Sequence, residues 1–302
     1  MPNLAIEMGA RDQPLLAQTI GDNLRQTVAR VPNNDAIVSS HQGLRWTYQD
    51  FYTRVQRLAS ALLAAGLKPL DRLGLWSPNY AEWTLVQYAT AEIGVVLVNI
   101  NPAYRTHELA YALNQSGCRF LIAAPSYLSS NYQEMVASVQ DQTPVLEQTV
   151  FFWSPEWEAL IAGDAHHQAG VENLRGQLNP DDPINIQYTS GTTGFPKGAT
   201  LTHRNILNNG YFVGELQRLT EQDRMCIPVP FYHCFGMVMG NLACTSHGAT
   251  MVIPSDGFDA ARTLEAVSQE RCTALYGVPT MFIAELAFED FTKFDLSSLR
   301  TG

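Results

Sequence analysis

Residues 189–198 concentrate the side chains of this sequence that are best suited to phosphate chemistry. The segment holds three glycines, four hydroxyl side chains and one lysine, and it contains no carboxylate. Glycines let successive backbone N–H groups turn toward one ligand, and hydroxyls add further donors. A lysine supplies the local positive charge that a protein of net charge −10 needs in order to hold ATP. The composition predicts a polyphosphate-binding loop, with a plain surface turn as the alternative.

Two well-known nucleotide-binding loops do not fit this segment. A P-loop ends in Gly-Lys-Ser/Thr, and its helix begins at the lysine. Pro196 stands in place of that glycine, and Gly198 follows Lys197 where a magnesium-binding hydroxyl is required. A Gly-x-Gly-x-x-Gly run after an early strand is also missing from the sequence, which disfavours a dinucleotide fold.

The elements that must position the loop are an apolar strand before it and a capped helix after it. Residues 184–188 have the pattern of the strand, and Thr202 or His203 begins the helix. Such alternation along the whole chain is typical of an α/β fold with mostly parallel sheets covered by helices. The predicted strands are residues 36–40, 44–48, 72–77, 95–100, 119–124, 149–153, 184–188, 224–230, 249–254 and 273–278.

Helical spacing and end signals predict three helices. Thr47 and Asp50 resemble a capping box before apolar residues that recur until Gly66. A second helix is predicted from Thr106 to Gly117. The helix after the loop is predicted to turn four residues inward, namely Ile206, Val213, Leu216 and Leu219.

Length and charge limit the class of protein. A chain of 302 residues is near the upper size for a single core, so one large domain and two smaller ones are both open. A join between subdomains is predicted in the polar residues 163–183. The net charge of −10 and the lack of a Lys/Arg run argue against a nucleic-acid partner. The apolar residues 59–67 are about half of a transmembrane span, and residues 1–11 lack the pattern of a secretory signal.

The cysteines and histidines predict neither a disulfide framework nor a metal centre. The five cysteines are odd in number and form no Cys-x-x-Cys pair, which favours free thiols in a reducing cytoplasm. The cysteines and histidines of residues 226–247 match no common zinc spacing. His166 and His167 are expected at the solvated surface.

The loop and several other segments resemble one enzyme family. Residues 188–198, Tyr-Thr-Ser-Gly-Thr-Thr-Gly-Phe-Pro-Lys-Gly, resemble the phosphate-loop signature of the AMP-forming acyl-adenylate superfamily, and residues 199–205 continue it. Residues 230–236 resemble the aromatic–histidine motif of that family, and residues 276–281 resemble its acyl-pocket segment. Residues 99–105 resemble a segment of fatty acyl-CoA synthetases, and these segments together indicate the medium-chain branch. The resemblance covers residues 13–302 as an AMP-binding domain.

The resemblance implies activation of a fatty acid in two steps. The acid attacks the α-phosphate of ATP to give acyl-AMP and pyrophosphate, and the thiol of CoA then displaces AMP. ATP, Mg²⁺ and CoA are thus implied, and the partners are small molecules. The implied catalytic residues are Lys197, Thr192 and His233. The implied phosphate-binding residues are Thr189, Ser190, Gly191, Thr192, Thr193, Gly194, Phe195, Pro196, Lys197 and Gly198.

An acyl pocket is also implied by the resemblance. Its residues are His233, Gly277, Val278, Pro279 and Thr280. Without the resemblance, His233 fits a core histidine better than a site residue, whereas an acyl pocket and a buried strand and turn fit the other four residues equally well. The aromatic and methionine side chains of residues 232–239 form either a tunnel wall or plain core.

The later motifs of the family do not occur in this sequence. They comprise the adenine-contacting segment, a Tyr-Gly-x-Thr-Glu segment whose glutamate assists magnesium, the ribose-binding aspartate, the hinge and the C-terminal lysine domain. The resemblance therefore implies the N-terminal portion of the AMP-binding fold, truncated, from a parent that is a fatty acid:CoA ligase. We expect the isolated chain to adenylate slowly at most. Two alternatives stay open: a non-catalytic ATP- or acyl-binding fragment, and an adenylating enzyme that passes its acyl group to a carrier protein.

Overall fold

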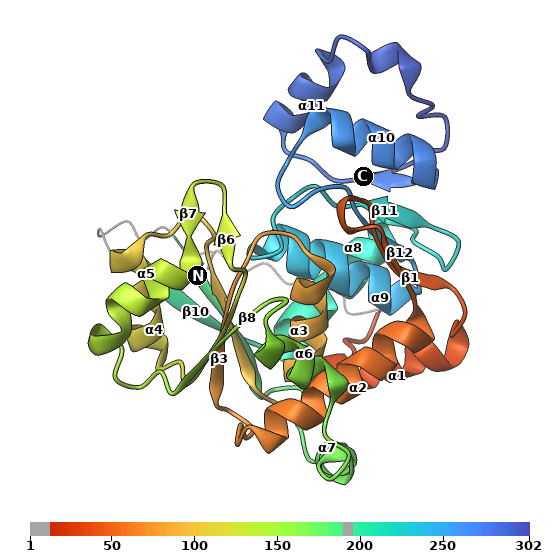
Figure 1. The fold of residues 1–302 in the computed structure, drawn as a ribbon. Coiled ribbons are helices and arrows are strands. Elements are labelled where there is room, and N and C mark those ends of the chain that lie inside the picture. The colour runs from red at the N-terminus through yellow and green to blue at the C-terminus, as the bar shows by residue number, and fades with distance from the viewer. Residues whose placement is uncertain (1–12, 190–195) are drawn as a thin grey trace, which may run out of the picture.

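A computed structural model describes residues 13–189 and 196–302, and Figure 1 shows how their helices and strands are arranged. Within these residues the larger sheet has six strands in the order β10-β9-β4-β3-β5-β8. All neighbours are parallel except β9 and β10. The strands are β3 (Arg72–Trp76), β4 (Val96–Ile100), β5 (Phe120–Ala123), β8 (Gln148–Phe151), β9 (Pro183–Thr189) and β10 (Lys197–Thr202).

A second sheet has the order β13-β11-β12-β1-β2, and only its pair β1 and β2 is antiparallel. A short hairpin of β6 and β7 stands apart from both sheets. These strands are β1 (Asp35–Ser39), β2 (Leu44–Thr47), β6 (Ser126–Tyr127), β7 (Ser130–Asn131), β11 (Arg224–Cys226), β12 (Thr250–Ile253) and β13 (Ala274–Leu275). The α/β class and the mostly parallel pairing predicted from the sequence are confirmed.

Helices cover both sheets, and their ends follow the capping signals of the sequence. Thr47 and Asp50 form a complete capping box at the start of α2, and Gly117 ends α4 in the left-handed conformation with φ 65°. The helices are α1 (Ile20–Arg30), α2 (Tyr48–Ala64), α3 (Ala81–Glu92), α4 (Thr106–Ser116), α5 (Tyr132–Val139), α6 (Pro155–Ala162), α7 (Gln168–Leu174), α8 (His203–Gln217), α9 (Ala243–His247), α10 (Ala260–Glu270) and α11 (Pro279–Leu286).

Helix α3 joins the two sheets into one core. Every residue of this helix is buried, as expected for a helix that is surrounded by protein on all sides. It contacts β3 and β4 of the larger sheet and β1 of the smaller sheet, and Figure 1 shows it between them. The position of α3 therefore fixes the two sheets relative to each other.

Each predicted strand is present, but three details of the prediction differ. Strand β10 has no predicted counterpart, because most of its residues are exposed and lack an apolar alternation. Strand β11 ends at Cys226 rather than at residue 230, since Pro228 and Pro230 have no N–H for a ladder. Residues 276–278 likewise lie outside β13. The proposed join in residues 163–183 stays a prediction; this segment contains α7, which packs against α2.

The predicted inner face of α8 is partly wrong. Leu216 is 85% exposed, whereas Ile206 and Leu219 are buried as predicted. Two glycines occupy the inner side instead, because a Cβ atom on Gly210 or Gly214 would lie 2.8 Å or less from the segment of η3 (Phe235–Leu242) and α9. Close helix packing thus replaces the bulky side chain that the helical spacing predicted.

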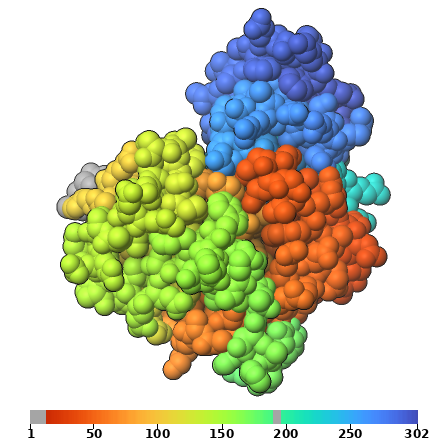
Figure 2. Space-filling model, in the orientation of Figure 1, coloured from red at the N-terminus to blue at the C-terminus, as the bar shows by residue number. Residues whose placement is uncertain are grey.

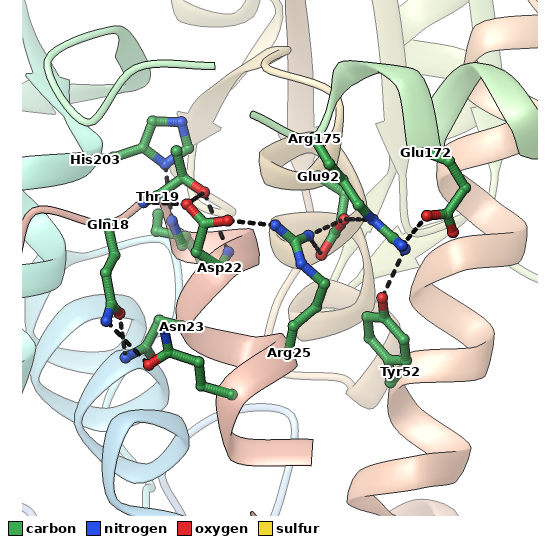
Figure 3. A network of polar contacts seen from close by, with 12 residues as sticks. Gln18, Thr19, Asp22, Asn23, Arg25, Tyr52, Glu92, Glu172, Arg175 and His203 are labelled. Atoms are coloured by element: carbon green, nitrogen blue, oxygen red, sulfur yellow. Dashed lines mark hydrogen bonds and ion pairs between the residues drawn. The ribbon is translucent and has the colours of Figure 1, made fainter. Parts of the chain in front are cut away.

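A polar network around the buried Glu92 ties four helices together (Figure 3). Arg25 of α1 donates to the Glu92 carboxylate at 2.8 Å and also pairs with Asp22. Arg175, just after α7, reaches Tyr52 and Gln56 of α2, each at 2.7 Å. Burial raises the pKa of Glu92, and the two arginines oppose that effect. The network holds α1, α2, α3 and the end of α7 at one corner of the fold.

His203, the first residue of α8, binds the start of helix α1. Its Nδ1 accepts the backbone N–H of Ile20 at 3.1 Å, so the neutral ring is the form that the fold requires. Burial lowers the pKa of His203 to about 4, and Nε2 has no hydrogen-bond partner within the described residues.

None of the helices in residues 13–189 and 196–302 is both long and apolar enough to cross a membrane.

We expect His203→Asn to flatten the acid sensitivity of the chain. Since the folded pKa of about 4 lies below the unfolded value of 6.5, the unfolded state binds more protons between these two pH values. Stability is therefore lost as the pH falls through that window, by about 3 kcal/mol. Asparagine keeps the acceptor but does not titrate. Urea unfolding of both proteins at pH 7 and pH 4.5 measures the difference, and equal slopes of stability against pH would contradict the assignment.

Candidate functional site

The antiparallel pair β9 and β10 brings together both ends of the predicted phosphate loop. Thr189 pairs with Lys197 across the hairpin, and the Thr189 hydroxyl donates to the Lys197 carbonyl at 3.4 Å. Lys197 is exposed at this edge of the sheet. Six residues of the predicted loop lie outside the described residues, namely Ser190, Gly191, Thr192, Thr193, Gly194 and Phe195.

Helix α4 anchors the two ends of the loop. The Tyr111 hydroxyl donates to the Pro196 carbonyl at 3.1 Å, and the Tyr188 hydroxyl donates to the Ala112 carbonyl at 3.0 Å. Burial raises the pKa of Tyr188 to about 12, so this phenol stays a donor at neutral pH. Gly198 fits closely, because a Cβ atom there would lie 3.0 Å from the Ile186 side chain. The lysine therefore extends from a fixed strand.

The segment of residues 230–236 is a compact turn. The His233 N–H donates to the Pro230 carbonyl at 3.3 Å, and the Gly236 N–H donates to the His233 carbonyl at 3.0 Å. A Cβ atom on Gly236 would lie 2.3 Å from the Pro230 carbonyl oxygen, so only glycine fits. The turn continues into η3 (Phe235–Leu242), a π-helix, which is a rare form that often marks functional sites.

The His233 ring lies at the exposed side of this turn, so it is not a core histidine. The backbone N–H of Phe235 donates to its Nδ1 at 3.1 Å. A neutral ring must then carry its proton on Nε2, since one nitrogen accepts and the other donates. The turn thus presents Nε2–H as a donor suited to an anionic oxygen.

Buried amide side chains hold the turn from two sides. Asn99 of β4 and Gln187 of β9 both donate to the Tyr232 carbonyl, at 3.0 and 2.8 Å. Asn79 donates to the Val229 carbonyl at 2.9 Å and accepts the Phe231 N–H at 2.8 Å. The spacing of the motifs gave no indication of these contacts, because only the sheet register brings the amides together.

The segment of residues 276–280 lies next to the histidine turn, but its form differs from the prediction. The Tyr276 ring packs against Phe235 with centroids 5.0 Å apart, and its hydroxyl donates to the Met239 carbonyl at 2.9 Å. A Cβ atom on Gly277 would lie 3.0 Å from the Phe282 ring. Val278, Pro279 and Thr280 are exposed at the start of α11, so the alternative of a buried strand is wrong. Their contact with an acyl group stays a prediction.

Helix α11 has an unusual distribution of polarity. Glu285 is 3% exposed, its Oε1 atom has no partner within the described residues, and burial raises its pKa to about 7. The apolar side chains of Ile283 and Leu286 are instead 65% and 68% exposed. Helical spacing alone did not single out this helix or its buried carboxyl group.

A mainly apolar cavity of about 280 Å³ opens beside the histidine turn. Figure 2 shows a notch there, between the C-terminal part that carries α10 and α11 and the hairpin of β6 and β7. The cavity brings together residues from six separate segments, including Asn101, Pro102, Tyr127, Tyr232 and Met281. Two segments of the predicted resemblance, residues 99–105 and 230–236, therefore line one space.

The described residues contain no group of three or more His, Cys, Asp or Glu side chains that could hold a metal ion. All five cysteines are free; four are buried and Cys234 is half-buried. Residues 166 and 167 are exposed, as predicted.

The comparison with protein families assigns the chain to one family. Residues 24–302 match the family described as AMP-binding enzyme, and the chain belongs to that family. The predicted resemblance to the AMP-binding family is thereby confirmed.

Similar proteins narrow the relationship. The chain is 40% identical to the mitochondrial medium-chain acyl-CoA ligase ACSF2 of Danio rerio, over 97% of this chain and 52% of that protein. It is 42% identical to the putative acyl-CoA synthetase YngI of Bacillus subtilis, over 95% of this chain and 56% of that protein. The solved N-terminal domain of FACL13 from Mycobacterium tuberculosis has a TM-score of 0.82 and 25% identity, covering 94% of this chain and 70% of that one. The chain thus spans about half the length of the curated relatives it matches.

We expect Gly236→Ala to destabilise the chain, because the new methyl group meets the Pro230 carbonyl oxygen. The atoms nearest to it all belong to the backbone of Pro230 and Phe231, so no flexible side chain can give way and the cost is about 1–3 kcal/mol. Gly170→Ala in α7 is the matched control, since its methyl group meets only the end of the Leu63 side chain, 3.3 Å away. Urea unfolding measures both changes. Equal stability of the two variants would show that the turn is not closed in this way.

Proposed function

We propose that the protein activates a carboxylic acid with ATP, first as an acyl-adenylate and then as a CoA thioester. The observation that carries this proposal is that one strand, β9, connects the phosphate-loop motif with the histidine motif. Strand β9 leads through Thr189 into the phosphate loop, and its Gln187 side chain binds the turn that presents His233. Membership of the AMP-binding family supports the same chemistry.

The two steps place different demands on these residues. In the first step a carboxylate oxygen bonds to the α-phosphorus of ATP while the bond to pyrophosphate breaks. Lys197, with the N–H and hydroxyl groups of the loop including Thr192, offsets the repulsion between these anions and stabilises the leaving pyrophosphate. Nε2–H of His233 orients the carboxylate. In the second step the CoA thiolate attacks the acyl carbonyl and AMP leaves.

Mg²⁺ belongs to this proposal as the ion that enters with ATP. Of the described residues near the loop, Thr189 offers a hydroxyl, a hard oxygen donor of the kind that Mg²⁺ accepts. No His, Cys, Asp or Glu cluster accompanies it within the described residues. The ion supplies charge neutralisation on the phosphates, and the chain supplies the lysine and the loop donors.

A medium-chain fatty acid is the substrate that we favour. Two of the similar proteins are named acyl-CoA ligase or synthetase, and the first of these is named for medium-chain acids. The cavity of about 280 Å³ beside Tyr232 is mainly apolar, which suits an alkyl chain. The same names favour CoA over a carrier protein as the acyl acceptor. The free thiols agree with a reducing compartment, and we place the protein in the cytoplasm.

The test is pyrophosphate exchange into ATP by the complete gene product that includes this chain. Acids of two to sixteen carbons and benzoate are compared. We expect exchange to depend on the acid and to peak at medium chain length. Exchange that ignores the acid, or nucleotide binding with no exchange, would contradict the proposal.

We expect Lys197→Ala to lower this exchange by about 10²–10³-fold, because it removes a positive charge at the phosphates. Lys197 is exposed, so stability should change by less than about 0.5 kcal/mol. Lys68→Ala is the control, because Lys68 is also exposed but lies just before the start of β3. Exchange rates and urea unfolding are measured together; an unchanged rate in Lys197→Ala would remove this lysine from the site.

A further inference from the structure

The peptide bond before His233 is held by two buried amides. Gln187 Nε2 donates to the Tyr232 carbonyl at 2.8 Å, and Asn99 Nδ2 donates to it at 3.0 Å. A carbonyl oxygen has two lone pairs, so both are satisfied and the plane of this peptide is fixed. Asn99 is 1% and Gln187 is 6% exposed, so the bonds form away from water, where breaking one is costly.

The two amides also fix each other. Asn99 pairs with Gln187 in the parallel register of β4 and β9, and Asn99 Nδ2 lies 3.2 Å from Gln187 Oε1. Asn185 donates to Asn99 Oδ1 at 2.9 Å, and Asn99 Nδ2 lies 2.9 Å from the Met237 sulfur. A network in which each amide is held by another rigidifies the groups that it binds.

The other side of His233 is held as well. The Phe235 N–H donates to Nδ1 at 3.1 Å, while the amides fix the backbone on the Tyr232 side. Ring orientation and tautomer are therefore both determined, with the proton on Nε2. Gln187 lies two residues before Thr189 on β9. The side chain that fixes the turn of His233 therefore comes from the same strand that leads into the phosphate loop.

We propose that Gln187 and Asn99 are positioning residues that hold the His233 ring against the reacting anions. This role rests on the proposed function, because it concerns the orientation of the carboxylate that attacks ATP. The amides touch no substrate atom themselves and act through the Tyr232 carbonyl. Misplacing a reacting group by about 1 Å costs about 10²-fold in rate.

A double-mutant cycle in the complete gene product tests this role. Gln187→Met keeps the shape of the side chain but removes the donor to Tyr232. We expect kcat for exchange to fall by about 10²-fold, with KM for ATP changed by less than about threefold. In a His233→Ala background the same substitution should change kcat by less than about threefold, because the ring that it positions is gone. Equal losses in both backgrounds would overturn the proposal.

Asn208→Leu is the matched control. Asn208 is a buried amide, 6% exposed, whose side chain accepts from the Leu16 N–H and donates to the Leu16 carbonyl. It makes no hydrogen bond to the histidine turn among the contacts of the described residues. We expect it to lower stability but to leave kcat within about twofold. A loss of kcat equal to that of Gln187→Met would show that any buried amide has this effect, and would overturn the role.

A second readout does not require activity. The ¹⁵N chemical shifts of His233 in the 302-residue chain report which ring nitrogen carries the proton. We expect the Nε2–H tautomer in the unmodified chain and a mixture of tautomers in Gln187→Met. The same tautomer in both would contradict the positioning role. If the complete gene product exchanges pyrophosphate with no acid, the proposed function fails, and these shifts alone decide whether the amides orient the ring.

Discussion

The Tyr232 carbonyl oxygen, which accepts hydrogen bonds from Asn99 and Gln187, is the contact on which the candidate site depends. Its two donors come from neighbouring parallel strands, and its peptide bond leads directly into His233. Desolvating amides is costly unless all their bonds are made, so the contact forms only when β4, β9 and the turn are correctly placed together. The placement of the turn therefore depends on the pairing of β4 with β9.

The rest of the fold supplies what this contact requires. Helix α3 lies between the sheets, and its Gln87 side chain donates to the Met237 carbonyl at 3.1 Å, which places η3 behind the turn. Helix α4 fixes both ends of the predicted phosphate loop, because its Tyr111 hydroxyl donates to Pro196 and its Ala112 carbonyl accepts from Tyr188 of β9. The lysine and the histidine thus extend from rigid elements, which is the arrangement that precise positioning of two anions demands.

Much of this architecture was predictable from the sequence, because strands and capping boxes are local patterns. Thr47 with Asp50 at α2 is an example, as is the strand before the loop. The sequence reasoning failed where contacts between distant segments decide. Leu216 has helical spacing for the inner face, yet its side chain is exposed. The inner side of α8 is formed by Gly210 and Gly214, which pack closely against the segment of η3 and α9. Gln187 and Asn99 are 88 residues apart, and no periodicity relates them before the strand order is known.

The most direct measurement is a crystal structure of the complete gene product that includes this chain, with a non-hydrolysable acyl-adenylate analogue, an acyl sulfamate of adenosine. We expect the sulfamate between the loop that joins Thr189 to Lys197 and Nε2 of His233, with the Tyr232 carbonyl still held by both amides. The acyl chain should enter the apolar space beside the histidine turn. An analogue bound away from His233, or a turn released from Gln187 and Asn99 when the analogue binds, would contradict the account.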